Sequence, residues 1–165
     1  MQEVVESTEG LRVWKGTIPV QNLYTAGKAG EVFFRALRDR GVILGSPCGG
    51  CGIVYVPARL FCERCFGALE TTRPVGPGGR VEAVSEVHQD SDGKPLPRPM
   101  VLVAVRLDGA GTLLIHRIAV PSSARRRGGV PVRVGSRVRA VLEPRSGRRG
   151  SILDIRHFVP SRSRR

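Results

Sequence analysis

The sequence predicts a mainly β protein made of an N-terminal helix, a rubredoxin-like zinc ribbon and a five-stranded OB-fold barrel. Three observations predict this architecture. Four cysteines stand at the spacing C-x2-C-x10-C-x2-C, which is typical of a metal-bound ribbon. Residues 29–40 precede them with apolar side chains at helical spacing, and short strand-like segments bounded by turn residues follow from residue 80.

Residues 1–41 are expected to form an arm and one helix, which Gly41 is well placed to end. The adjacent rings of Phe33 and Phe34 diverge by about 100° around a helix axis, so at least one should contact a partner or the ribbon. We expect the helix and the ribbon to form the main docking surface, with Trp14 extending it. The alternative is that these rings only pack the helix against the ribbon.

Residues 42–72 are expected to form the zinc ribbon. Its ligands would be the four cysteines of the chain, namely Cys48, Cys51, Cys62 and Cys65. Four thiolates can hold one tetrahedral zinc at about 2.3 Å per sulfur, a closed structural site with no position left for water. Iron, disulfides and two separate redox C-x-x-C pairs are the alternatives. The short 18-residue span and the lack of a strand-to-helix setting for either pair favour zinc over them.

Residues 73–79 are rich in proline and glycine and predict a linker. Residues 80–159 are expected to be the OB-fold, and residues 160–165 a disordered basic tail. The strands are expected at 80–88, 100–107, 112–120, 132–142 and 151–158. Five strands without an intervening long helix favour a small closed barrel.

The net charge is +13, and the segment from Pro121 onward carries thirteen arginines against two acidic residues. Such a field attracts phosphate, whether on nucleic acid or on a phosphorylated cofactor. The high ratio of arginine to lysine, 24 to 3, is also typical of a GC-rich genome, so a merely solvated surface is the alternative. No stretch approaches the roughly 20 apolar residues of a membrane span. The acidic N-terminus lacks a signal-peptide pattern, so we expect a reducing, cytoplasmic setting.

Catalytic motifs are missing from the sequence. It has no phosphate-binding loop of the Walker type, no G-x-S-x-G and no H-E-x-x-H. His88, His116 and His157 each fall alone on an expected strand, where a structural role is the usual one. The chain is therefore expected to be a binder or scaffold and not an enzyme by itself. An independent hydrolase is the alternative, and it would lack an evident nucleophile.

The distribution of aromatic residues separates two kinds of binder. Seven of the eight aromatic residues lie at or before Phe66, and Phe158 alone lies in the barrel segment. OB-folds that bind single-stranded nucleic acid stack bases on aromatic side chains. The barrel here has the basic charge without that platform. Aromatic residues on the arm, helix and ribbon suit a protein interface instead.

The chain resembles the acyl-CoA-associated zinc-ribbon/OB-fold family, which has long been catalogued as a domain of unknown function. The resemblance rests on YTAGKAGEVFFRAL (24–37), the cysteine ribbon (48–65), GGRVEAVSEVH (78–88), RPMVLVAVRLD (98–108) and VRVGSRVRAVLE (132–143). It covers nearly everything from Tyr24 to Phe158. The cysteine spacing is shared by many ribbons, whereas the order helix, ribbon, barrel is much more specific.

The resemblance implies a non-catalytic small subunit of a thiolase-like enzyme, such as a thiolase or a retro-aldolase. In this family the large partner carries the catalytic residues, and the small subunit stabilises it and helps to shape the acyl-CoA channel. The four cysteines carry over as metal ligands, and no catalytic residue does. The densest arginine cluster, Arg125, Arg126 and Arg127, could contact the phosphates of a coenzyme A thioester. The alternative function is that of a single-stranded nucleic-acid-binding protein.

Overall fold

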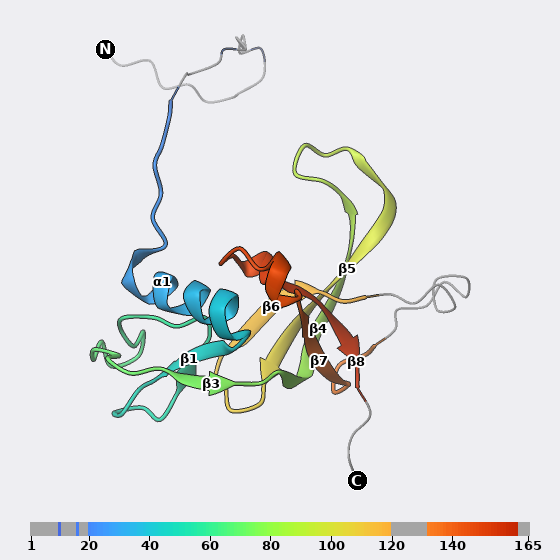
Figure 1. Cartoon of the computed structure of the whole chain (residues 1–165). Helices are drawn as coiled ribbons and strands as arrows, with labels where there is room; N and C mark the ends of the chain where they lie inside the picture. The colour runs from blue at the N-terminus through green and yellow to red at the C-terminus, as the bar shows by residue number, and fades with distance from the viewer. Residues whose placement is uncertain (1–9, 11–15, 17–19, 120–131, 162–165) are drawn as a thin grey trace.

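The computed structural model describes residues 10, 16, 20–119 and 132–161 (Figure 1). A helical segment comes first, as α1 (Gly27–Arg35) and one π-helical turn η1 (Ala36–Arg40). The ribbon strands are β1 (Ile43–Pro47), β2 (Val54–Tyr55) and β3 (Arg73–Val75). The barrel strands are β4 (Gly78–Gln89), β5 (Pro95–Leu107), β6 (Leu113–Arg117), β7 (Arg137–Leu142) and β8 (Ile155–Pro160), with short 3₁₀ turns η2 (Arg145–Gly147) and η3 (Ile152–Asp154). The expected fold class is confirmed.

The helix ends where the sequence predicts it to end. Gly41 has a φ of +64°, a left-handed conformation that glycine adopts without strain. Its backbone N–H donates to the carbonyl of Leu37. A Cβ at Gly41 would also lie 2.6 Å from the nearest guanidinium nitrogen of Arg148, so the absence of a side chain lets the barrel's last loop approach the helix.

The ribbon forms a three-stranded antiparallel sheet in the order β2-β1-β3. Its third strand corrects an expectation, because residues 73–75 had the composition of a linker. Val75 pairs instead with Ile43 and is buried, and Pro74 pairs with Leu44. An edge strand tolerates proline because one of its sides needs no N–H donor. β4 then begins at Gly78, so little free linker separates the ribbon from the barrel.

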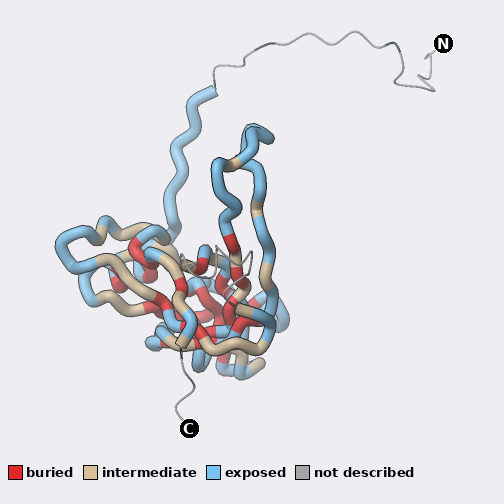
Figure 2. The backbone as a smooth tube through the Cα atoms, turned by 90° about the vertical axis from the view of Figure 1, so that its right-hand side faces the viewer, coloured by how far each residue is buried: buried red, intermediate tan, exposed pale blue. Residues whose placement is uncertain are grey.

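The barrel is a five-stranded sheet in the order β6-β5-β4-β7-β8. A parallel bridge between Ile118 and Phe158 joins its two ends, and the N–H of Ala119 donates to the carbonyl of Phe158. Alternate residues of the strands point inward to a core that contains Val81, Val103 and Val138. β4 and β5 run beyond the barrel as a long hairpin whose outer half is mostly exposed (Figures 1 and 2).

Hydrogen bonds fix the ribbon to the barrel at the turn between β5 and β6. Thr112 Oγ1 accepts from the N–H of Val56 at 2.8 Å and donates to its carbonyl at 3.1 Å. The N–H of Gly111 donates to the carbonyl of Val54. A single apolar core runs through the helix, the ribbon and the barrel, so the ribbon is held in one orientation.

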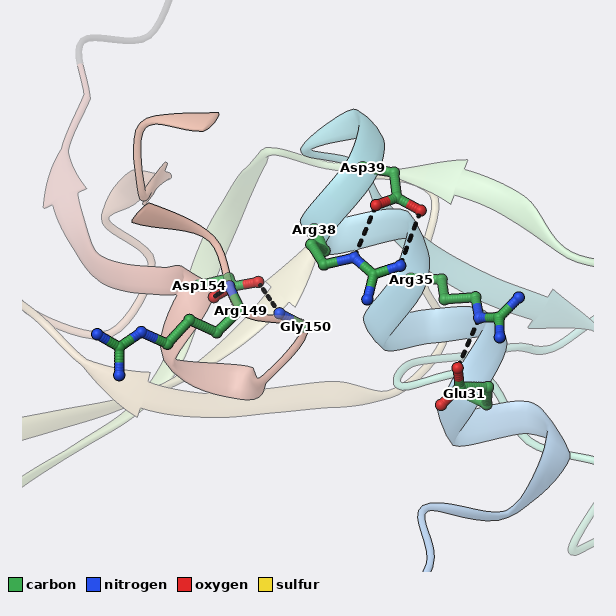
Figure 3. A network of polar contacts seen from close by, with 7 residues as sticks. All are labelled: Glu31, Arg35, Arg38, Asp39, Arg149, Gly150 and Asp154. Atoms are coloured by element: carbon green, nitrogen blue, oxygen red, sulfur yellow. Dashed lines mark hydrogen bonds and ion pairs between the residues drawn. The ribbon is translucent and has the colours of Figure 1, made fainter. Parts of the chain in front are cut away.

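The loop between β7 and β8 packs against the helix (Figure 3). The Asp154 carboxylate is buried and accepts from the N–H groups of Arg149 and Gly150 at 2.9 and 2.8 Å. Gly150 thereby lies against the side chain of Arg38 and the carbonyl of Phe34. Among the described residues, no helix has the length and apolar character needed to cross a membrane.

Candidate metal centre and docking surfaces

The four cysteine sulfurs converge on one point, as the sequence predicts. All four Sγ atoms lie within 4.8 Å of one another. Cys48 and Cys65 are 3.5 Å apart and Cys51 and Cys62 are 3.8 Å apart, measured between sulfurs. Disulfide bonds need about 2.05 Å, so neither of these pairs is bonded. Because all four sulfurs share one site, the arrangement is not that of two separate redox C-x-x-C pairs.

This donor set fits a zinc ion. A tetrahedron with zinc–sulfur bonds of 2.3 Å has edges of about 3.8 Å, close to the sulfur separations of 3.5 and 3.8 Å. Cys48 and Cys62 are buried, whereas Cys51 is half-buried and Cys65 is exposed. Four thiolates would complete the coordination of the ion and leave no open position, so a bound zinc would pin the ribbon rather than activate water.

Two equivalent turns present the sulfurs. In the first, the N–H of Cys48 donates to the carbonyl of Ile53, and the N–H of Gly52 donates back to the carbonyl of Cys48. In the second, Cys62 donates to Gly67, and Phe66 donates back to Cys62. We call these turns the first knuckle (48–53) and the second knuckle (62–67). Gly52 and Phe66 occupy the same position in them.

Both of these equivalent residues have a left-handed backbone. Gly52 has a φ of +68° and Phe66 a φ of +58°. Glycine adopts this conformation freely, whereas a residue with a Cβ loses about 1–2 kcal/mol. Phe66 is the one non-glycine residue with positive φ in the described part of the chain. The second knuckle therefore carries backbone strain that the first does not.

A buried tyrosine supports the sulfur cluster. The Tyr55 hydroxyl lies 3.2 Å from Cys62 Sγ, and the Tyr55 side chain is fully buried. This hydrogen bond is the main cause that lowers the pKa of Cys62 to about 6, and it raises the pKa of Tyr55 to about 12. The hydroxyl therefore favours the thiolate, the form that binds metal. Arg59 lies over the Tyr55 ring at 5.3 Å and pairs with Glu63.

The three histidines lie on three different barrel strands. His88 is exposed on the projecting hairpin and lies 3.7 Å from Glu86. His116 and His157 are half-buried on β6 and β8, and burial is the main cause that lowers the pKa of each. His116 packs edge-on against Phe158, and its buried Nδ1 has no hydrogen-bond partner among the described residues.

The expected interface residues have different places in the structure. Phe33 is fully buried in the chain's own core, so its ring is not presented on the surface, contrary to the interface expectation. Phe34 is half-buried against the same core and meets Phe33 edge-on at 5.5 Å. The helix accommodates both rings because the ribbon lies on one side of it and the last barrel loop on another. Trp14 and the cluster 125–127 lie outside the described residues.

The exposed aromatic residues are ones that the periodicity did not single out. Tyr24 is 88% exposed in the extended segment before α1, and Phe61 and Phe66 are 63% and 79% exposed on the ribbon. Phe158, the barrel's single aromatic residue, is fully buried. One sequence signal could have pointed to Phe66, since the residue that follows the first cysteine pair at the same spacing, Gly52, is a glycine. The described part of the barrel thus presents no exposed aromatic ring, whereas the ribbon presents Phe61 and Phe66.

A cleft lies between the ribbon and the barrel. Its volume is about 530 Å³, and β1, β3, β7 and β8 contribute to its walls. Val42, Val75 and Leu142 give it an apolar lining, and Arg139 adds one cationic group. Arg139 makes no ion pair with the described acidic residues, unlike Arg137, which holds the Asp108 carboxylate in two hydrogen bonds of 2.7 and 2.6 Å.

The fold and the cysteine site define a zinc-ribbon/OB-fold protein. Two family models match the chain in that order: the ChsH2 rubredoxin-like zinc ribbon domain over residues 35–70 and the ChsH2 C-terminal OB-fold domain over residues 72–143. Together they span more than half of the chain. The chain therefore belongs to the ChsH2-type family, in which a zinc ribbon precedes an OB-fold domain, as the resemblance predicted. The domain boundary falls at residue 71 in these matches.

Solved structures agree with this assignment. A DUF35-family protein of unknown function from Sulfolobus solfataricus is 28% identical, with a TM-score of 0.55, over 70% of this chain and 78% of that chain. The Ltp2-ChsH2(DUF35) aldolase matches at 18% identity and a TM-score of 0.56, over 81% of this chain and 95% of that chain. No curated protein matches significantly.

Proposed function

We propose that this chain is a non-catalytic small subunit of a thiolase-like acyl-CoA enzyme, a thiolase or an aldolase, within a hetero-oligomer. The observation that carries the proposal is the placement of the exposed aromatic side chains, Tyr24, Phe61 and Phe66, on the arm and ribbon of a ChsH2-type fold. Aromatic anchors of this kind are typical of protein interfaces. The structural similarity to the Ltp2-ChsH2(DUF35) aldolase, a complex by its name, adds support.

The zinc would have a structural role in this subunit. Closed four-thiolate coordination would leave the metal unable to bind substrate. The described histidines and carboxylates offer no paired acid and base in a cavity, so the chain's contribution is binding and shape. The four unbonded cysteines suit a reducing compartment, and we propose a cytoplasmic location on that ground.

The alternative function, binding of single-stranded nucleic acid, has the net charge of +13 in its favour. The buried position of Phe158 weighs against it. Without an exposed ring on the barrel, each base would lose a stacking contribution of roughly 1–3 kcal/mol. Three guanidinium groups on the barrel surface are also less available to phosphate, because Arg106, Arg137 and Arg156 each pair with a carboxylate.

We further propose that the subunit helps to form the acyl-CoA channel. The apolar cleft between ribbon and barrel supports this role, because Arg139 places a cation beside an apolar lining. Arg125, Arg126 and Arg127 remain candidates for the coenzyme A phosphates, since guanidinium groups bind phosphate through two hydrogen bonds. Neutralising all three should raise the complex's apparent KM for acyl-CoA, and added salt should shrink the effect. An unchanged KM at low ionic strength, with the complex intact, would remove them from the channel.

The central experiment is affinity purification of the tagged full chain from its source cells, followed by native mass spectrometry and metal analysis. The proposal predicts a complex with a thiolase-fold acyl-CoA enzyme and one zinc per small subunit. Recovery of the chain without such an enzyme, together with tight and steeply salt-dependent binding to single strands, would favour the nucleic-acid function. Turnover of an acyl-CoA by the purified chain alone would contradict the non-catalytic role.

A further inference from the structure

The second knuckle has a phenylalanine at the position where the first knuckle has a glycine. Both knuckles close with the same two backbone hydrogen bonds, so the positions of Gly52 and Phe66 are structurally equivalent. The φ of +58° at Phe66 is one that a residue with a Cβ avoids. Glycine would satisfy the same turn without strain, as it does at position 52. The ring of Phe66 must therefore be explained by something other than the turn.

Packing within the chain does not explain this ring. Phe66 is 79% exposed, and Phe61 in the same loop is 63% exposed. The neighbouring side chains that do stabilise the ribbon are buried instead, namely Tyr55, Cys62 and Leu69. Strained residues with exposed functional groups cluster at binding sites, where the gain on binding offsets the strain. An exposed aromatic side chain on a pinned loop is a typical interface anchor.

We propose that the second knuckle, through Phe66 and together with the adjacent Phe61, inserts into an apolar pocket of the large subunit and is the anchor of the hetero-oligomer. This inference rests on the proposed function. The zinc-bound knuckle would hold both rings in place before binding, so little conformational entropy is lost on docking. The ribbon lies on the opposite side of the molecule from β8 in Figure 1, and hydrogen bonds join it rigidly to the barrel.

The exposed area argues for a large partner and against a second copy of this chain. Phenylalanine side chains bury roughly 200 Å² each when covered, so the exposed parts of Phe61, Phe66 and Leu60 offer about 350 Å² together. A stable interface needs about 800 Å² on each side. Knuckle-to-knuckle pairing of two copies would therefore be too small. A larger partner that also covers other exposed residues, such as Leu23 and Tyr24 in the segment before α1, would come closer to the required area.

Charge suggests what borders the pocket. Arg59 and Glu63 pair with each other on the ribbon. Arg64, between Cys62 and Phe66, is exposed and makes no ion pair with the described acidic residues. A partner carboxylate at the rim of the apolar pocket would pair with it. The partner site is thus an apolar, aromatic-accepting pocket with an acidic edge.

The experiment compares Phe66→Gly and Phe66→Asn with the wild-type full chain, using the co-purified large subunit. Glycine and asparagine both tolerate positive φ, so each variant removes the ring and relieves the backbone. Three quantities are measured: zinc content, the Tm of the full chain and the Kd of the complex. Ile115→Ala is the matched control, because Ile115 is 66% exposed on the barrel and outside the proposed anchor.

We expect opposite effects on stability and binding. Zinc content should be unchanged, and the Tm should stay equal or rise by up to about 4 °C, because relief of strain is partly offset by the entropy of the substituted chain. The Kd of the complex should increase at least tenfold, and the control should bind like wild type. Equal affinity of the Phe66 variants, loss of zinc from them, or equal weakening by Ile115→Ala would overturn the inference. If the wild-type chain forms no complex with a thiolase-like enzyme, the proposed function itself fails.

Discussion

Removal of one hydroxyl group should weaken zinc binding without disturbing the fold. Tyr55→Phe keeps the ring that fills the ribbon interior and deletes the hydroxyl that lies 3.2 Å from Cys62 Sγ. Hydrogen bonds to charged groups contribute about 1.5–3 kcal/mol. Loss of a hydrogen bond to a metal ligand lowers metal affinity by about 10–100-fold, which corresponds to about 1.4–2.7 kcal/mol. The two estimates agree, so we expect a zinc Kd between ten and a hundred times larger.

Competition with a chromophoric chelator measures this Kd directly. The chain has two tyrosines, and the second supplies a matched control, because Tyr24 is 88% exposed and far from the sulfurs in sequence. Tyr24→Phe should bind zinc like wild type. A Tyr55→Phe Kd within twofold of wild type would show that the hydroxyl does not support the thiolate cluster. An equal loss in the Tyr24 variant would refute the reasoning as well.

Three further predictions concern stability. Phe33→Ala should lower the free energy of unfolding by about 3–5 kcal/mol, because Phe33 is fully buried. Phe34→Ala should lower it less, because Phe34 is half-buried. Equal losses for the two variants in urea titrations would contradict this expectation. A chelator should abolish hydrogen-exchange protection in residues 42–72 before the barrel strands, because the metal pins the ribbon; simultaneous loss would contradict a separate role. Arg137 lowers the pKa of Asp108 through their side-chain hydrogen bonds. Their ion pair therefore stabilises the fold by less than about 1 kcal/mol, and this contribution is fully present above the pKa of Asp108 in the unfolded chain, about 3.9. The stability difference between wild type and Arg137→Met should vanish as the pH falls through the lower folded pKa, and a pH-independent difference would be contrary evidence.

Local chemistry made much of the fold predictable. The four cysteines at their spacing require convergence on one point, and the structure brings their sulfurs within 4.8 Å. Gly41 ends the helix because few residues other than glycine adopt φ +64°. The five barrel strands appear in the expected order because alternating apolar residues, such as those at 101, 103 and 105, must share the buried face.

Features that depend on distant residues escaped prediction. Residues 73–75 have linker composition, and only their pairing with β1 makes them a strand. Phe33 and Phe34 have similar local patterns, and tertiary packing alone decides that Phe33 is fully buried. Phe66 lies in a turn whose strain becomes visible only when its φ is compared with that of Gly52. For residues 73–75 and for Phe33, the missing information was which surface lies opposite the residue, and for Phe66 it was the backbone conformation.

We propose that this chain acts through a catalytic partner and has no activity alone. The most direct measurement is the acyl-CoA turnover of the purified large subunit as the zinc-loaded chain is titrated into it. We expect no turnover by the chain alone, and we expect the activity of the large subunit to rise and to saturate at a fixed stoichiometry. An activity of the large subunit that does not change with added chain, although the two proteins bind, would contradict it.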